Sequence, residues 1–172
     1  MTRFTGIRKY GDKILRNKTE KVKEFGPELK PLFKQMEETM TDAKGVGLAA
    51  PQIGVPKQIA IMNPEPDDEK KLIRMINPRI VAASDETDRL EEGCLSVPGV
   101  RGDVVRASEV TVAYQDENGK EHTLHAEGLL ARIVQHELDH LNGVLFIDRL
   151  SFAKRSLIKA KLKDIADGGK EK

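Results

Sequence analysis

The sequence predicts an α+β fold in which antiparallel or mixed sheets surround a central, buried helix. Three observations support this class. Apolar residues cover a wide arc of residues 127–141, as expected for a helix that is buried on most sides. Alternating apolar and polar residues flank the pair Asn118-Gly119, a strong hairpin signal. Two further segments, one towards each end of the chain, carry apolar residues at helical spacing.

Length and composition indicate a single domain with a well-charged surface. The chain has 172 residues, of which 38% are hydrophobic and 33% charged, and its net charge is +1. We expect one catalytic domain over residues 1–166, including the last helix, and a disordered tail over 167–172. The charge balance gives no overall attraction to DNA or to a membrane surface. Because neither a signal peptide nor a span of ~20 apolar residues is visible, we expect a cytosolic protein.

The first helix is predicted to begin at Gly26-Pro27 and to end at Gly45. Proline suits the first turn of a helix, and glycine suits the residue that follows the last turn. The residues of its apolar face, expected to pack in the core, are Leu29, Leu32, Phe33, Met36, Met40 and Ala43.

A stretch rich in glycine and alanine follows, GVGLAAPQIG over residues 45–54. It has two interpretations, a tight connection between helix and strand, or one wall of an active site with backbone N–H groups and the Gln52 amide facing substrate. Beyond it, short strands are expected at 58–62, 71–76 and 78–82. The charged run 85–92 is expected to be a solvated connection.

The second half of the chain is predicted to contain a hairpin, the central helix and a terminal helix. The hairpin strands are 110–114 and 121–126, and the central helix is 127–141, followed by a buried strand at 144–147. Ser151 is expected to cap the last helix. The residues of its packing face are Leu157, Ile158, Leu162 and Ile165.

The central helix carries the sequence His136-Glu137-Leu138-Asp139-His140, which reads H-E-x-x-H. Residues four apart lie on the same face of a helix, so His136 and His140 can direct nitrogens at one metal ion. Glu137 lies beside them, where a carboxylate can exchange a proton with a metal-bound water. Two histidines do not complete such a site, and a third ligand is needed.

The third ligand is expected upstream, at Cys94. No histidine follows His140, and Phe146 occupies the place of the last ligand in the extended peptidase motif. A lone cysteine is more often a small buried apolar residue, but thiolate is a good ligand for Zn²⁺ or Fe²⁺. His122 and His125 lie three apart in a predicted strand, on opposite faces, so they are expected to be structural or solvated.

Three stretches together resemble the peptide deformylase family, and they occur in the family's order. These are GVGLAAPQIG over residues 45–54, EGCLS over 92–96 and QHELDH over 135–140. The resemblance extends from Ile7 to about Leu162. It implies that Cys94, His136 and His140 are the metal ligands, and that Glu137 is the catalytic acid/base.

The resemblance also implies roles around the metal. Gln52 and the backbone N–H of Leu95 match donors to the carbonyl oxygen, and Gly47 matches a backbone contact to substrate. Residues at positions of the family's methionine pocket or groove are Val46, Leu90, Leu129, Ile133 and Arg101. Arg132 falls among pocket positions that are often apolar in relatives.

The implied reaction is removal of the formyl group from N-formylmethionyl nascent polypeptides, with release of formate. A metal-bound hydroxide would attack the formyl carbon, while Glu137 acts as general acid and base. The resemblance suggests Fe²⁺ in the cell. A Cys/His/His site also accepts Zn²⁺, Ni²⁺ or Co²⁺ in purified protein.

The last 22 residues hold seven lysines or arginines, and two interpretations apply to them. They can form a solvated amphipathic helix, or a basic face that binds RNA phosphates. The resemblance adds that this helix docks on the ribosome near the exit tunnel. Two other functions compete with a deformylase: a peptidase that uses the same metal chemistry, and a non-enzymatic metal-binding or RNA-binding module.

Overall fold

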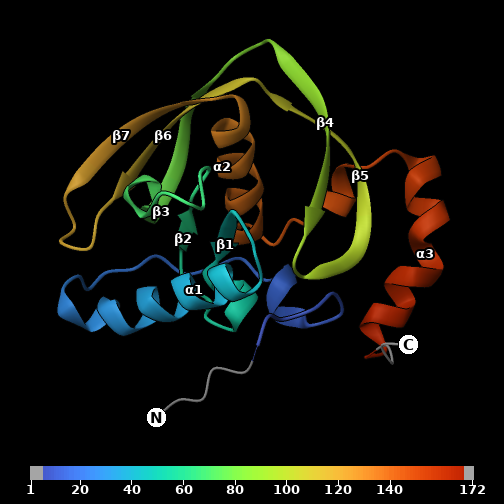
Figure 1. The fold of residues 1–172 in the computed structure, drawn as a ribbon, viewed down its shortest axis with the longest axis horizontal. Helices are drawn as coiled ribbons and strands as arrows, with labels where there is room; N and C mark the ends of the chain where they lie inside the picture. Colours follow the sequence, from blue (N-terminus) through green and yellow to red (C-terminus); the bar gives the residue numbers. More distant parts are fainter. Residues whose placement is uncertain (1–5, 169–172) are drawn as a thin grey trace.

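A computed structural model describes residues 6–168 and has an α+β architecture with two antiparallel sheets (Figure 1). The five-stranded sheet has the order β1-β2-β3-β6-β7, and the second sheet is the pair β4-β5. The strands are β1 Gly47–Ala49, β2 Ile59–Met62, β3 Ile73–Ala83, β4 Thr87–Cys94, β5 Val97–Ala107, β6 Glu109–Gln115 and β7 Glu121–Glu127. The fold class and the predicted β6-β7 hairpin are therefore confirmed.

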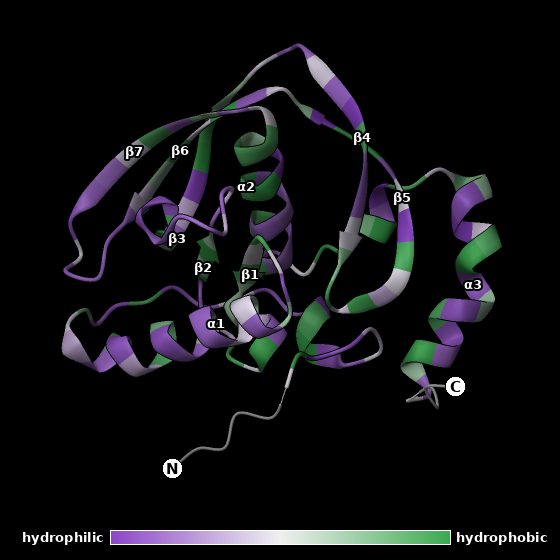
Figure 2. Cartoon of the chain, viewed as in Figure 1, coloured by the Kyte–Doolittle hydropathy of each residue, from purple (hydrophilic) through white to green (hydrophobic). Residues whose placement is uncertain are grey.

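Helix α2, Gly128–Leu141, lies at the centre of the molecule, as predicted (Figure 1). One side packs on the five-stranded sheet, where Val134 and Leu138 join Met62 of β2 and Val112 of β6 in one hydrophobic cluster. Figure 2 shows the resulting apolar colouring along α2 and the strands beneath it. Because α2 has core on several sides, its backbone is well fixed, and the side chains it carries are held with it.

Helix α1, Lys30–Asp42, covers the other side of the sheet, with Phe33, Met36 and Met40 buried. A single turn of 3-10 helix at Pro27–Leu29 precedes it. The predicted end at Gly45 is wrong by a short distance. The left-handed residue after the helix is Lys44, with a φ of 55°, and Gly45 donates its N–H to Met40 O in the closing turn.

Three strand predictions and one predicted connection need correction. The segments expected at 71–76 and 78–82 are one strand, β3, interrupted at Asn77, whose φ of 51° produces a shift in register. The charged run 85–92 is not a connection, because most of it forms β4, paired with the unpredicted β5. These strands are charged because their sheet has only two strands and leaves much of its surface exposed. The predicted strand at 144–147 is instead an irregular segment, Val144 and Leu145, followed by the 3-10 helix Phe146–Arg149, in which Phe146 and Ile147 are buried.

Helix α3, Phe152–Ala166, begins at Ser151, whose side chain accepts a hydrogen bond from the N–H of Lys154, as predicted. It packs through Ile158, with Leu162 and Ile165 partly buried. Leu157 does not belong to the packing face, since 81% of it is exposed. No helix within residues 6–168 has the length and apolar character needed to cross a membrane. Of the tail predicted to be disordered, residues 169–172 lie outside the described part of the chain.

Candidate active site

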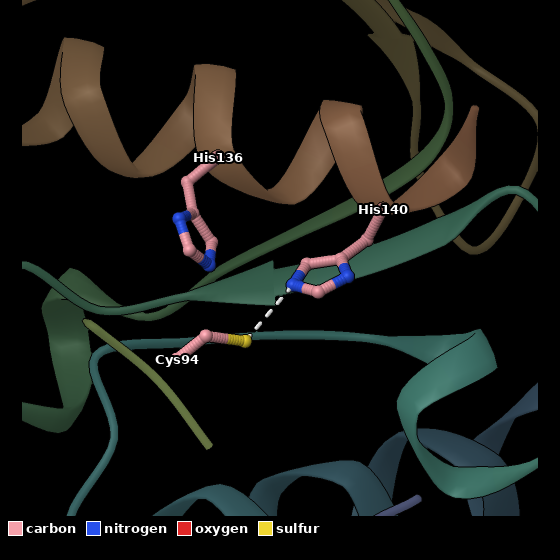
Figure 3. A group of neighbouring side chains, drawn as sticks. All are labelled: Cys94, His136 and His140. Atoms are coloured by element: carbon pink, nitrogen blue, oxygen red, sulfur yellow. Dashed lines mark hydrogen bonds between the residues drawn. The ribbon is translucent and has the colours of Figure 1, made fainter. Parts of the chain in front are cut away.

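Cys94, His136 and His140 converge at one point, although they come from different elements (Figure 3). The two histidines project from successive turns of α2, and Cys94 is the last residue of β4. The Cys94 Sγ lies 3.3 Å from His140 Nε2, and one ligand atom from each of the three residues lies within 4.8 Å of the others. The predicted third ligand is therefore brought to the H-E-x-x-H helix.

The charges of the three side chains suit a cation. Burial alone would keep Cys94 protonated, but His140 and His136 hold the pKa of its thiol well below the ordinary value. Burial also disfavours the charged form of His136 and by itself would lower its pKa. Hydrogen bonds with Cys94 and Glu92 outweigh burial and raise that pKa to about 10. Both pKa shifts favour the charged forms of these side chains, a thiolate at Cys94 and an imidazolium at His136. A cation can replace the imidazolium proton.

Glu137 is buried against the glycine-rich stretch. Only 4% of it is exposed, and its Oε2 has no hydrogen-bond partner among the described residues. Burial raises the pKa of this carboxyl group. A Cβ added to Gly47 would overlap Glu137 Oε1 and approach Ile133 to 3.0 Å, so a larger residue at this place would displace the carboxyl group. The active-site interpretation of residues 45–54 is therefore favoured over a simple connection.

Gln52 also points its amide into the site. Its Oε1 accepts a hydrogen bond from the Ala49 N–H, which fixes the direction of the amide. Its Nε2 lies 3.6 Å from Cys94 Sγ and donates to Ser96 Oγ at 3.1 Å. The side chain is 2% exposed, so this donor is held rigidly beside the ligand sulfur.

A cavity of about 620 Å³ opens beside these groups and contains most of the predicted substrate residues. It is lined by Val46, Gly47, Gln52, Cys94, Leu95, Arg101, Leu129, Ile133, His136 and Glu137, among others. Arg101 is exposed and pairs with Glu91 at the edge. Leu90 is not part of the lining. It lies on β4, 53% exposed, two residues before Glu92.

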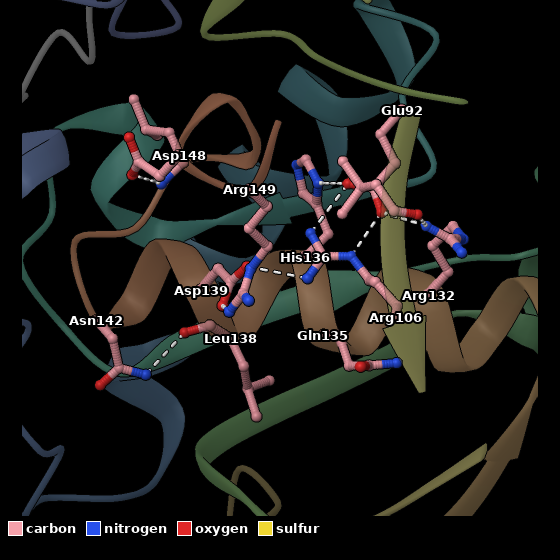
Figure 4. A network of polar contacts seen from close by, with 12 residues as sticks. Glu92, Arg106, Arg132, Gln135, His136, Leu138, Asp139, Asn142, Asp148 and Arg149 are labelled. Atoms are coloured by element: carbon pink, nitrogen blue, oxygen red, sulfur yellow. Dashed lines mark hydrogen bonds and ion pairs between the residues drawn. The ribbon is translucent and has the colours of Figure 1, made fainter. Parts of the chain in front are cut away.

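Sequence reasoning missed the charged network behind His136 (Figure 4). Glu92 Oε2 lies 3.0 Å from His136 Nδ1, and Glu92 Oε1 accepts hydrogen bonds from Arg106 and Arg132. Arg106 continues to Asp139, which also pairs with Arg149. These contacts oppose the effect of burial and hold the pKa of Glu92 well below its ordinary value. The available signal was Glu92 itself, an acid two residues before Cys94.

The three converging residues fit a divalent cation by their chemistry. Bonds of about 2.3 Å to sulfur and about 2.1 Å to nitrogen, at a tetrahedral angle, separate the two ligand atoms by about 3.6 Å. The observed 3.3 Å between Cys94 Sγ and His140 Nε2 agrees with this arrangement. The Nδ1 of His136 is occupied by Glu92, which leaves its Nε2 for the cation.

A Cys/His/His centre with a buried carboxylate, on this α+β fold, defines a metal-dependent hydrolase. The family model described as polypeptide deformylase matches residues 4–156. The chain belongs to the peptide deformylase family, whose members remove N-terminal formyl groups from nascent peptides, and it carries the metal-binding triad for that reaction.

Curated relatives and solved structures agree with this assignment. Peptide deformylase of Christiangramia forsetii is 44% identical, over 92% of this chain and 88% of the relative. That of Opitutus terrae is 47% identical, over 91% and 90%. The peptide deformylase structure from Plasmodium falciparum superposes with a TM-score of 0.91 at 40% identity, covering 94% of this chain and 95% of that one. The Legionella pneumophila structure gives 0.86 at 45% identity, covering 92% of each chain.

Proposed function

We propose that this chain hydrolyses the formyl group of N-formylmethionyl polypeptides with Glu137 as acid and base and with Gln52 and Leu95 as oxyanion donors. The observation that carries the proposal is the buried carboxyl group of Glu137, packed on Gly47 beside the three converging ligands. When bound by Cys94, His136 and His140, a divalent cation supplies Lewis-acid activation of a water molecule.

Glu137 is suited to move protons at neutral pH. Its pKa is raised by burial, which brings it closer to the pH at which it must both accept and release a proton. Its Oε2 is free of other hydrogen bonds within the described structure, so the proton has an acceptor. Glu137 then delivers that proton to the amine that leaves when the formyl C–N bond breaks.

Two donors would stabilise the negative charge that develops on the formyl oxygen. The Gln52 amide stands at the ligand sulfur, and Leu95 is in the tight turn between Cys94 and Val97, at the cavity wall. Preorganised donors of this kind cost no rearrangement during the reaction. Gln52 would exchange its weak contact with Cys94 for the substrate oxygen.

The cavity suits a small acyl group and an apolar side chain. Gly47 packs its backbone directly against Glu137 and Ile133, which makes this wall of the cavity narrow. A formyl group is the smallest acyl group, because its carbonyl carbon carries only hydrogen, and it suits such a wall. Ile133, Leu129 and Val46 provide apolar surface for the methionine side chain. We assign Arg101 to the outer edge of the cavity, near the substrate residues that follow the methionine. Leu90 would contribute only from the rim, because it does not line the cavity.

The decisive experiment offers formyl-Met-Ala-Ser to the metal-loaded protein. We expect formate and an intact tripeptide, whereas cleavage between residues would identify a peptidase. The variant Glu137→Gln should keep its metal and lose about 10²–10⁴-fold in turnover. Unchanged turnover would refute the role of Glu137, and a wild-type protein without turnover would favour a metal-binding or RNA-binding module.

We propose Fe²⁺ as the metal in the cell. The soft thiolate and two imidazoles accept Fe²⁺, Zn²⁺, Ni²⁺ or Co²⁺, so the choice rests on the family resemblance. Metal analysis of protein purified without oxygen, together with its activity, tests this assignment. Zinc in the most active fraction would argue against it.

We propose that α3 docks on the ribosome near the exit tunnel, which would also fit a cytosolic location. Between Lys154 and Lys163 the helix holds five lysines or arginines, and most of its surface is exposed. Binding to RNA phosphates weakens steeply with salt. Replacing Arg155, Lys159 and Lys163 by Glu should abolish salt-sensitive co-sedimentation with ribosomes and leave turnover of the free formyl peptide unchanged.

A further inference from the structure

The metal ligands come from two parts of the fold that are not joined by a common sheet. Cys94 ends β4 in the two-stranded sheet, whereas His136 and His140 lie on α2, which packs on the five-stranded sheet. Within residues 6–168, no strand pairing connects the two sheets. The turn after Cys94 is held by Tyr10 and Gln52, which bond Ser96. A further constraint on the distance between Cys94 and the imidazoles comes from side-chain contacts between the β4-β5 sheet and α2.

Arg132 makes more of these contacts than its place in the pocket suggests; Figure 4 shows it beside Glu92. It lies one turn before His136 on α2 and is 7% exposed. Its guanidinium donates to Asp88 O on β4 at 2.9 Å, to Val104 O on β5 at 3.0 Å, and to Glu92 Oε1 at 2.8 Å. One side chain thus holds both strands of the second sheet and the carboxylate behind His136.

We propose that Arg132 is a positioning residue that holds the β4-β5 sheet on α2 and so keeps Cys94 in place for the cation bound by His136 and His140. The inference rests on the proposed use of these three residues as metal ligands. The planar guanidinium suits the task because its fixed donors reach several acceptors at once. It also explains why an arginine occupies a position that otherwise faces an apolar pocket.

The variant Arg132→Met is a suitable test, because the other contacts of Glu92 and the contacts between Gln135 and β5 do not involve Arg132. Glu92 keeps its two hydrogen bonds from Arg106 and its contact with His136, so no buried carboxylate is left unpaired. Gln135 still bonds both backbone groups of Ala107 on β5. Methionine fills a similar volume along the cavity wall. We therefore expect this variant to fold with its sheet less firmly attached.

The test is titration of metal-free protein with Co²⁺, followed by calorimetry and by the thiolate-to-cobalt charge-transfer absorption. Arg132→Met should bind Co²⁺ about 10–100-fold more weakly, as found for contacts that orient ligands, and should still reach the thiolate band at saturation. Arg132→Lys keeps the positive charge but has a single compact donor group. Its Co²⁺ affinity should lie between those of the wild-type protein and Arg132→Met. Arg89→Met changes an exposed arginine on β4, the strand that Arg132 contacts; it is the control and should match the wild-type protein.

A double-variant comparison separates positioning of Cys94 from a general loosening of the protein. In a Cys94→Ser background only the two histidines of one helix hold the metal, so Arg132→Met should change Co²⁺ affinity less than threefold. Affinity within twofold of the wild-type value in the native background would overturn the proposal. So would an equal loss in both backgrounds.

If Arg132→Met does not fold, Arg132→Lys tests the proposal instead. Its Co²⁺ affinity is compared with that of the protein with Arg132 in the native background and in the Cys94→Ser background. These binding results do not depend on catalysis. Absence of formate release by the metal-loaded wild-type protein would overturn the proposed function and leave the role of Arg132 to be judged by Co²⁺ affinity.

Discussion

The Nδ1 of His136 lies 3.0 Å from the Oε2 of Glu92, and this contact turns the other nitrogen of the ring towards Cys94 and His140. Glu92 is 6% exposed and is held in turn by two arginines. A carboxylate bonded to the back of a ligand histidine fixes its tautomer and ring direction. The site thus depends on Glu92, although this residue does not belong to the ligand set.

The first prediction concerns Glu92→Gln. The amide cannot balance the charge of the buried Arg106, and it bonds His136 less strongly. We expect the free energy of unfolding to fall by about 3 kcal/mol, because a buried ion pair loses one partner. Metal affinity should fall about 10–100-fold. Chemical denaturation and metal competition measure the two effects. An exposed control, Glu121→Gln, should show neither, and a Glu92→Gln protein with wild-type metal affinity would contradict the role of this carboxylate.

The second prediction concerns Gly47→Ala. The added methyl group would overlap Glu137 and press on Ile133, so the carboxyl group must move. Misplacement of a reacting group by about 1 Å costs on the order of 10²-fold in rate. We expect kcat/KM for formyl-Met-Ala-Ser to fall about 100-fold, with metal content and circular dichroism unchanged. Retention of activity within threefold would mean that Glu137 does not act from its present position.

The motifs could be predicted from the sequence, whereas the contacts that support them could not. H-E-x-x-H fixes the spacing of His136 and His140 once the segment is helical, and the lack of a later histidine points upstream to Cys94. The β4 strand was missed because charge in an exposed two-stranded sheet looks like charge in a loop. The contacts of Arg132 could not be predicted for a related reason. Its acceptors at Asp88 and Val104 are backbone carbonyls, which leave no pattern in the sequence.

The third prediction concerns Gln52→Leu, which removes the proposed amide donor and keeps a side chain of similar size. Loss of one oxyanion donor typically raises the barrier by ~3 kcal/mol, so kcat should fall about 100-fold. Ser96→Ala is the matched control, because it removes only the acceptor that Gln52 now uses. We expect Ser96→Ala to change kcat less than fivefold. Equal losses in the two variants would indicate that the Gln52–Ser96 bond matters for structure and that Gln52 does not bind the oxyanion.

The last prediction is that metal affinity falls as the pH falls. In the metal-free protein the pKa of His136 is raised to about 10. Its imidazole is therefore expected to carry protons on both nitrogens, and a positive charge, throughout the neutral range. Only the neutral ring can bind a cation, so binding must displace that proton. Below pH 10 each unit of pH then costs a factor of ten for this one proton, and the dissociation constant should rise about 100-fold from pH 8 to pH 6.

The measurement is competition with a chelator of known pH dependence, together with calorimetry in two buffers that differ in ionisation enthalpy. The calorimetric difference gives the protons released on binding, and we expect about one from His136. His122 is the control, because its ring pairs with Asp116 on the β6-β7 hairpin, away from the ligands. His122→Gln should keep the same pH dependence. An affinity that stays constant between pH 6 and pH 8 would show that His136 is already neutral before the metal binds, and that Glu92 orients the ring without adding a proton to it.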